Sequence, residues 1–194
     1  MTSVTIIQAR TNSQRLPGKV LLPINSIPIV VLTAKRASNT GRSVIVATSI
    51  EESDDGLVKV LEDYQIDYFR GSLKDTLSRI VAALSGYSDD TVVTRLTADN
   101  VFPDGVLLDE IELYFNKKSY KYLVCNGPES GVPYGVSAEV TKLKYLRAAN
   151  KYSKCEFERE HVTPYIIGKY GKKFYKKYES LKMGKYRVTI DDID

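Results

Sequence analysis

The 194-residue sequence predicts an α/β fold with a mostly parallel central sheet, helices on both faces and an irregular second half. Apolar runs of strand length alternate with segments whose apolar residues recur at the helical period, and this alternation indicates βαβ units. The chain contains no internal repeat and no low-complexity linker. We therefore expect a single domain over residues 1–194.

Each expected element follows from its own residues. The expected strands are the apolar runs at residues 4–8, 43–48, 66–69, 91–96, 122–125, 136–140 and 187–190. The expected helices cover residues 28–38, 54–65, 71–84, 103–115 and 142–150. Proline suits the first turn of the helix that begins at Pro28. Leu57, Val60 and Leu61 form one apolar stripe, which is typical of a helix with one buried face.

The second half is less regular, and we expect an irregular insertion near residues 126–136. The late segment "KYGKKFYKKYESLKMGKY" interleaves lysine with tyrosine. That pattern occurs in proteins that bind single-stranded nucleic acid, but it also fits an exposed amphipathic element or an edge strand. We expect no nucleic-acid partner. The chain stops directly after its last apparent strand, so we expect it to be the N-terminal part of a longer polypeptide, fused to a further domain.

Composition and charge exclude several classes of protein. A net charge of +4 is too small to indicate nucleic acid or a membrane by itself. No window approaches the roughly 18 apolar residues of a membrane helix, and we expect no secretory signal. Spacing does not exclude a disulfide between Cys125 and Cys155, but reduced thiols and a cytoplasmic location are expected. The single histidine, His161, argues against a Ser-His-Asp triad or a multi-histidine zinc site.

The segment "VTIIQARTNSQRLPGKVLLPI" places three cations, Arg10, Arg15 and Lys19, directly after the first strand. Ligands of open parallel sheets bind outside the carboxyl ends of the strands. Arginine offers paired donors for phosphate oxygens, and lysine offers a mobile positive charge. Pro17 restricts the loop, and Gly18 allows close approach of the backbone. The order of a Walker A loop is absent. The segment therefore predicts either a polyphosphate-binding loop or a solvated surface loop.

Two aspartates end later strands. Asp99 follows the strand in "VVTRLTADN", and Asp191 follows the strand in "RVTIDD". Two carboxylates opposite a cationic loop suit a magnesium–nucleotide site, because Mg²⁺ takes one or two carboxylates together with phosphate oxygens and waters. Aspartate is also common in turns, and the pattern does not choose between the two interpretations.

Two further segments could hold an acceptor. In "EREHVTPYI", Glu160 and His161 could line its pocket, although a lone histidine is more often structural. In "PYGVSAEV", Gly135 and Glu139 lie where a loop enters a strand, and the glutamate could bind hydroxyl groups or face solvent.

Taken in order, these segments resemble the spore-coat polysaccharide (SpsF-type) cytidylyltransferases, relatives of the 3-deoxy-manno-octulosonate and N-acylneuraminate cytidylyltransferases. The resemblance is carried by "IIQARTNSQRLPGKVLLPI", "FRGSLKDTLSRIVAA", "VVTRLTADNVFPDGVLLDEI", "YGVSAEV", "EREHVTPYI" and "YRVTIDD". It spans nearly the whole chain. It implies a Rossmann-like nucleotide-diphospho-sugar transferase fold and transfer of CMP from CTP to a sugar or sugar-acid hydroxyl.

The resemblance also implies roles for individual residues. Arg15, Lys19 and Asp99 would act in catalysis. The nucleotide would lie against Ala9, Arg10, Arg15, Gly18, Lys19, Arg79 and Thr97. The acceptor would lie near Gly135, Glu139, Glu160 and His161, and Mg²⁺ would bind Asp99 and Asp191. Relatives usually carry glycine where this chain has Ala98.

The family also implies a homodimer and a place in surface polysaccharide or glycoconjugate biosynthesis. Three other functions stay open at this point. A related enzyme would use a sugar 1-phosphate to make a nucleoside-diphosphate sugar. A glycosyltransferase of similar architecture would consume a nucleotide-sugar rather than release pyrophosphate from CTP. A non-catalytic module within a larger protein would bind a nucleotide without the reaction.

Overall fold

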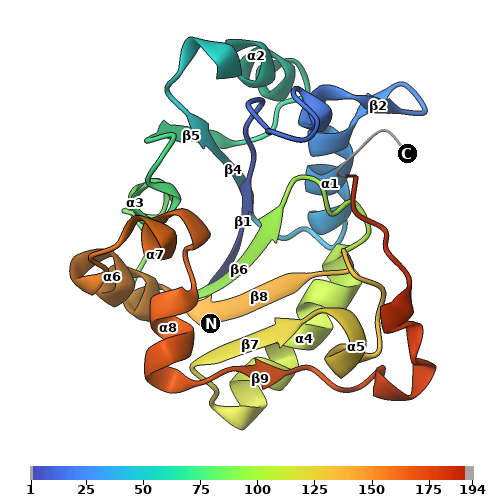
Figure 1. Cartoon of the computed structure of the whole chain (residues 1–194), viewed down its shortest axis with the longest axis vertical. Coiled ribbons are helices and arrows are strands. Elements are labelled where there is room, and N and C mark those ends of the chain that lie inside the picture. Colours follow the sequence, from blue (N-terminus) through green and yellow to red (C-terminus); the bar gives the residue numbers. More distant parts are fainter. Residues whose placement is uncertain (1, 191–194) are drawn as a thin grey trace.

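The computed structural model, which describes residues 2–190, confirms the α/β fold with a mostly parallel central sheet (Figure 1). The sheet strands are β1 (Ser3–Gln8), β4 (Val44–Ser49), β5 (Tyr68–Gly71), β6 (Val92–Thr97), β7 (Tyr122–Cys125), β8 (Ala138–Lys142) and β9 (Lys173–Phe174). A separate hairpin joins β2 (Pro23–Ile24) to β3 (Ile27–Pro28). The helices are α1 (Ile29–Ala37), α2 (Asp55–Asp63), α3 (Thr76–Ala83), α4 (Gly105–Lys118), α5 (Gly127–Ser130), α6 (Leu143–Tyr152), α7 (Glu156–His161) and α8 (Pro164–Tyr170). Short 3₁₀ turns cover Lys19–Leu21, Glu52–Asp54, Glu179–Leu181 and Met183–Lys185.

The sheet order is β5-β4-β1-β6-β8-β7-β9. The first four of these strands are parallel, whereas β8 runs antiparallel to both β6 and β7. At the end of β1, Gln8 pairs with Ala47 on one side and with Thr97 on the other. The ends of β1 and β6 are therefore level, β4 continues to Ser49, and the loops that follow these strands meet at one edge of the sheet.

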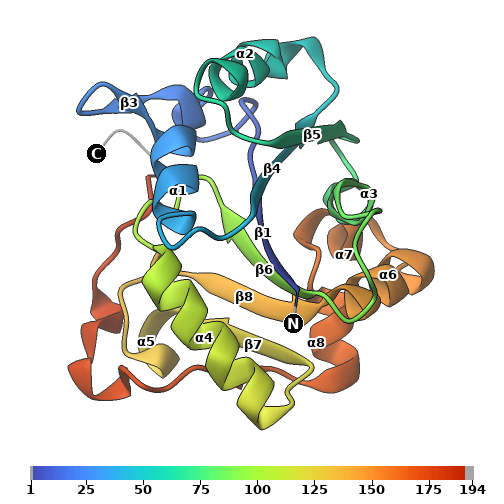
Figure 2. The same cartoon turned by 180° about the vertical axis from the view of Figure 1, so that it is seen from behind.

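Helices cover both faces of the sheet (Figures 1 and 2). On one face, α1, α2 and α4 pack through buried side chains such as Val30, Leu57 and Phe115. On the other face, α3, α6 and α8 pack through side chains such as Leu77 and Leu146. Burial of apolar side chains on both faces is what stabilises a parallel sheet of this kind.

Most expected elements lie within a few residues of the observed ones, but the expected strand at 187–190 is wrong. Arg187 makes a single bridge to Tyr134, and Val188 donates a backbone hydrogen bond to the Tyr134 carbonyl. No ladder forms over residues 187–190, all of which the structure describes. The apolar run is extended but lies against a loop rather than a neighbouring strand.

The β2–β3 hairpin and the helices α7 and α8 have no counterpart in the sequence prediction. The hairpin is only four paired residues long, and α7 buries none of its side chains deeply, so neither produces an apolar period. Within the expected irregular region, residues 127–130 form α5. The lysine- and tyrosine-rich segment contributes the short edge strand β9.

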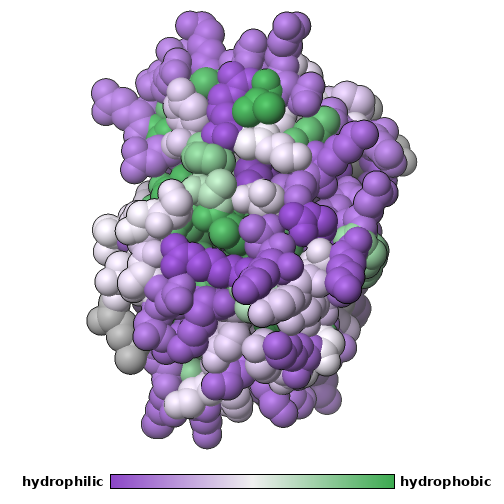
Figure 3. Space-filling view, turned by 90° about the vertical axis from the view of Figure 1, so that its left-hand side faces the viewer, coloured by the Kyte–Doolittle hydropathy of each residue, from purple (hydrophilic) through white to green (hydrophobic). Residues whose placement is uncertain are grey.

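The surface, the helix lengths and the two cysteines bear on the expectations from composition. The side that carries α3, α6 and α7 is mainly hydrophilic, with a smaller hydrophobic area (Figure 3). Within residues 2–190, no helix is long and apolar enough to cross a membrane. Cys125 and Cys155 are free thiols, and burial raises the pKa of Cys125 to about 11.

Candidate active site

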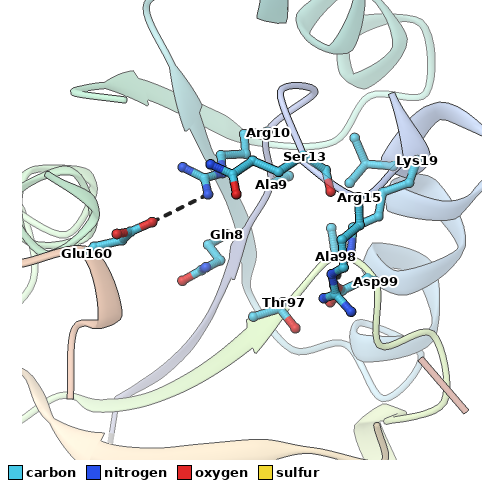
Figure 4. A pocket seen from close by; sticks show the side chains of 12 residues that line it. Gln8, Ala9, Arg10, Ser13, Arg15, Lys19, Thr97, Ala98, Asp99 and Glu160 are labelled. Atoms are coloured by element: carbon cyan, nitrogen blue, oxygen red, sulfur yellow. Dashed lines mark hydrogen bonds and ion pairs between the residues drawn. The ribbon is translucent and has the colours of Figure 1, made fainter. Parts of the chain in front are cut away.

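A cavity of about 530 Å³ opens at the carboxyl edge of the sheet, between β1, β6 and α7. Figure 4 shows the side chains around it. The loop after β1 contributes Arg10, Ser13, Arg15 and Lys19, β6 and its following turn contribute Thr97 and Asp99, and α7 contributes Glu160. Positive side chains outnumber carboxylates in this lining, so the cavity suits an anionic ligand.

The loop after β1 folds back on itself before the chain continues into the 3₁₀ turn Lys19–Leu21. Gly18 has a φ of +72°, a conformation that glycine adopts without strain. Its backbone N–H donates to the Thr11 carbonyl at 2.7 Å. Leu16 is buried beneath the loop. The turn brings Lys19 back to the cavity, where the structure also places Arg10 and Arg15.

Lys19 and Asp99 form an ion pair in the wall of the cavity. The Lys19 ammonium lies 2.5 Å from Asp99 Oδ2, and the two side chains are only 10% and 21% exposed. The turn that carries Asp99 is fixed, because Asn100 donates to the Thr97 hydroxyl at 2.8 Å and Thr33 donates to the Ala98 carbonyl at 3.0 Å. The buried lysine, at the start of the 3₁₀ turn Lys19–Leu21, and the half-buried aspartate, in the turn after β6, are thus held by two separate segments.

Arg10 and Glu160 lie at the opposite side of the cavity. Arg10 Nη2 is 3.5 Å from Glu160 Oε1, and these side chains are 39% and 50% exposed (Figure 4). An exposed pair at this distance contributes little to stability. The Arg10 guanidinium can therefore turn to an anion in the cavity at small cost.

A smaller cavity of about 150 Å³ lies beside the first and is lined by Arg10, Arg79, Arg95 and His161. Burial and the neighbouring positive charge of Arg10 lower the pKa of Arg79 to about 10. The Arg79 guanidinium donates to the Ser72 carbonyl at 2.5 Å, so it also fixes the loop between β5 and α3. Among the described residues that line the larger cavity, Arg79 is absent.

The residues expected at the acceptor side do not all come together. Glu160 lines both cavities and His161 lines the smaller one, whereas Gly135 and Glu139, both within the described residues, line neither. The Glu139 carboxylate accepts hydrogen bonds from Arg95, from the Tyr122 hydroxyl at 2.9 Å and from Thr163 at 3.4 Å.

Gly135 has a φ of +104°, and a Cβ there would lie 2.9 Å from the backbone nitrogen of Thr189. It therefore holds the late segment against the loop before β8. The positions of Glu139 and Gly135 are fixed by contacts with other residues of the chain. Their role in binding the acceptor stays a prediction.

Gln8, Arg95 and Asp54 are among the side chains of this region that sequence reasoning missed. Gln8 accepts hydrogen bonds from Arg95 at 2.6 and 3.1 Å, at the floor of the smaller cavity. A charged residue inside the apolar strand "VVTRLT" was the available signal for Arg95. Asp54 is fully buried and bonds the loop after β1. In the sequence it is one of several acidic residues before a helix, so nothing distinguished it.

The prediction of a Mg²⁺ site at Asp99 and Asp191 stays a prediction. In residues 2–190 no group of three or more histidine, cysteine, aspartate or glutamate side chains could hold a metal ion. Asp191, the second predicted ligand, lies outside the described residues. The backbone N–H of Ile190 donates to the Asp99 carbonyl at 3.3 Å, so the described chain ends beside Asp99. Asp99 offers the hard carboxylate oxygens that Mg²⁺ prefers, and a single protein carboxylate is sufficient when phosphates and waters complete the shell.

A mostly parallel sheet whose carboxyl edge holds a cationic loop beside a half-buried aspartate suits an α/β protein of the nucleotidyltransferase class. The cytidylyltransferase family model matches residues 4–188, and the chain belongs to that family. The spore coat polysaccharide biosynthesis protein SpsF of Bacillus subtilis is 33% identical over 96% of this chain and 80% of its own length. An uncharacterised protein of Methanocaldococcus jannaschii is 36% identical over the whole chain and 79% of its own length.

Solved structures agree with the family. A cytidylyltransferase from Leptospira borgpetersenii superposes with a TM-score of 0.88 at 30% identity, covering all of this chain and 82% of that one. CMP:2-keto-3-deoxy-manno-octonic acid synthetase, solved with CTP, superposes with a TM-score of 0.69 over 91% of this chain and 90% of its own. Its identity of 13% shows a shared fold alone.

Proposed function

We propose that this cytidylyltransferase transfers CMP from CTP to a hydroxyl group of a sugar or sugar acid and releases pyrophosphate. The observation that carries the proposal is the pair of buried Lys19 with half-buried Asp99, which lines a cavity that Arg10 and Arg15 also line. Family membership supports CTP as the donor. The similarity to SpsF supports a polysaccharide precursor as the product.

The cations of the loop would bind the triphosphate. Arg15 and Lys19 would stabilise the charge that grows on the departing pyrophosphate, because preorganised cations act most strongly where charge develops. Arg10 would exchange its weak contact with Glu160 for a phosphate oxygen. Ala9, Gly18 and Thr97 would lie against the nucleotide through backbone and small side chains. Positioning and charge compensation are the main contributions of a protein to phosphoryl transfer.

In the reaction, the acceptor oxygen forms a bond to the α-phosphorus while the bond from that phosphorus to the bridging oxygen breaks. Pyrophosphate leaves and the hydroxyl proton is released. Asp99 would hold Mg²⁺, with Asp191 as the second proposed ligand. A bound Mg²⁺ supplies charge stabilisation at phosphoryl oxygens. Lys19 now lies where it can keep the Asp99 carboxylate oriented toward the cavity.

The smaller cavity beside the first is the proposed acceptor side. Arg10, Arg79 and Arg95 surround it with positive charge, which favours an acceptor with an acidic group over a neutral sugar. Glu160 and His161 would contact acceptor hydroxyl groups. Glu139 would act through Arg95, because its carboxylate accepts a hydrogen bond from the Arg95 guanidinium. A homodimer, a cytoplasmic location and a role in surface polysaccharide synthesis belong to the same proposal.

The test is pyrophosphate release from CTP, UTP, ATP, GTP and dTTP, each with a panel of sugars, sugar acids and sugar 1-phosphates. We expect release with CTP, Mg²⁺ and a sugar or sugar acid, and a CMP-linked product by mass spectrometry. The Arg15→Met variant should lose most of this activity, whereas Lys59→Met, an exposed cation on α2, should not. Turnover with sugar 1-phosphates alone would replace the proposal by nucleoside-diphosphate sugar synthesis. No turnover with any combination of nucleotide and acceptor would favour a non-catalytic nucleotide-binding module.

A further inference from the structure

One carboxylate outside the cavity is connected to the loop that lines it. Asp54, the last residue of the 3₁₀ turn Glu52–Asp54, has no exposed surface. A buried carboxylate is costly unless hydrogen bonds satisfy it. Asp54 receives five such bonds, all from residues outside its own helix, so its place in the fold is fixed by what it binds.

The two oxygens of Asp54 bind two different segments. Oδ1 accepts the backbone N–H of Thr11 at 2.8 Å and the Thr11 hydroxyl at 2.7 Å. Oδ2 accepts the backbone N–H of Ser49 at 3.1 Å, the Ser49 hydroxyl at 2.5 Å and the Thr48 hydroxyl at 3.1 Å. The carboxylate therefore joins the end of β4 to the loop that follows β1.

Thr11 is the point at which that loop closes. It follows Arg10 directly, and its carbonyl accepts the N–H of Gly18, the residue before Lys19, at 2.7 Å. A contact that fixes Thr11 therefore fixes both ends of the segment that carries the cations of the cavity. The Thr11 hydroxyl has a single hydrogen, which Asp54 Oδ1 at 2.7 Å and the Ser53 carbonyl at 2.8 Å share as acceptors.

Only a carboxylate can make this connection in full. Each oxygen accepts one backbone N–H, from Thr11 or from Ser49, and a backbone N–H cannot turn to become an acceptor. Asparagine has one oxygen and one NH₂ group, so either orientation would direct a donor at one of the two N–H groups. Burial alone would raise the pKa of Asp54, but the hydrogen bonds from Ser49 and Thr11 hold it below its ordinary value. The group is thus an acceptor on both sides at neutral pH.

We propose that Asp54 is a positioning residue, which acts through Thr11 to set the geometry of the phosphate-binding loop for the triphosphate. The proposal rests on the function proposed above. It goes further in assigning the order of the loop to a side chain that lies outside the cavity. Loss of Asp54 would then weaken nucleotide binding through the loop, without changing any group that contacts the ligand.

The experiment compares Asp54→Asn with Asp55→Asn in titrations with CTP and with inorganic tripolyphosphate, each with Mg²⁺. Asp55 is the matched control, since it is the next residue, also a carboxylate, and 60% exposed beside Arg70. We expect the Kd of both ligands to rise about tenfold in Asp54→Asn, which is about 1.4 kcal/mol. In Asp55→Asn it should change by less than about twofold, as for an exposed pair.

Two readouts separate positioning from loss of fold. The KM for CTP should rise in Asp54→Asn while the KM for the acceptor stays unchanged. A merely structural role would reduce the amount of active protein and leave both KM values unchanged. Amide exchange of Gly18 should accelerate in this variant, while exchange in β7 should not. Should Asp54→Asn not fold, Thr11→Val removes the hydroxyl donor alone and is expected to raise both Kd values. Thr11→Ser keeps the donor and should restore binding.

The outcomes distinguish the two proposals. Unchanged Kd and unchanged Gly18 exchange in Asp54→Asn would overturn the role of Asp54. Wild-type binding of tripolyphosphate but not CTP would refute the proposed donor, and the variants would still test the loop. Wild-type protein that binds neither ligand would overturn both proposals.

Discussion

Replacing Lys19 by methionine tests the chemistry of the cavity most sharply. The change removes an ammonium group 2.5 Å from Asp99 and keeps an unbranched side chain. Removal of one preorganised electrostatic group lowers turnover by about 10²–10³-fold, or about 2.7–4 kcal/mol. Because Lys19 is largely buried, its charge acts through protein rather than bulk water, and we expect a loss in this range for pyrophosphate release.

The same substitution has a separate cost for folding. A fully buried pair that loses one partner costs about 3–5 kcal/mol, and an exposed one about 0–1 kcal/mol. The Asp99 side chain is 21% exposed, so we place the cost between these limits, at about 1–3 kcal/mol. For a chain of this size that lowers Tm by about 2–4 °C per kcal/mol.

A double variant separates the two effects. Combining Lys19→Met with Asp99→Asn removes both charges of the 2.5 Å pair, so part of the Tm lost in Lys19→Met should be recovered. Activity should stay low, because the cation and the carboxylate are both absent. Lys59→Met, at an exposed site on α2, is the control for loss of a positive charge. Wild-type turnover in Lys19→Met, or recovery of turnover in the double variant, would refute the catalytic assignment.

Three further predictions follow from single contacts. Glu160→Gln removes the ion pair with Arg10 and frees its guanidinium for the nucleotide. The Kd for CTP should fall by up to about fivefold, which is the contribution of an exposed pair, and a higher Kd in a CTP titration would contradict this. Because its hydrogen bonds lower the pKa of Asp54, stability should fall as pH drops below the ordinary aspartate value of about 4, and acid titration of unfolding in Asp54→Asn should show a smaller fall. Gly71→Ala places a Cβ 2.9 Å from Arg79 Cγ and should cost about 1–3 kcal/mol by thermal denaturation, with an unchanged Tm as the contrary result.

The parallel half of the fold could be predicted because each strand there is a continuous apolar run and each helix has a clear apolar stripe. For example, the apolar run at residues 44–49 and the stripe of Leu57 and Leu61 each indicate the element from neighbouring residues alone. The run at 187–190 looked the same but has no strand beside it, since pairing depends on distant parts of the chain. The short helix α7 buries no side chain deeply and left no pattern to detect.

The candidate site divides in the same way. The cationic loop and Asp99 could be predicted, because both follow a recognisable strand and ligands collect at that edge of a parallel sheet. The contact of Arg10 with Glu160 joins residues 150 positions apart, and only the fold reveals it. Asp54 could not be distinguished from its acidic neighbours, because its role depends on hydrogen bonds from Thr11 and Ser49 that the sequence does not show.

Nucleotide selectivity is the central claim, and thermal unfolding with CTP, UTP, ATP, GTP or dTTP, with and without Mg²⁺, tests it most directly. A ligand at a hundred times its Kd stabilises the folded state by about 2.7 kcal/mol. At about 2–4 °C per kcal/mol, this raises the Tm of a chain of this size by about 5–10 °C. We predict a shift of that size with CTP and Mg²⁺ and a clearly smaller one with each other nucleotide. An equal shift with all five nucleotides, or none with any, would contradict the account.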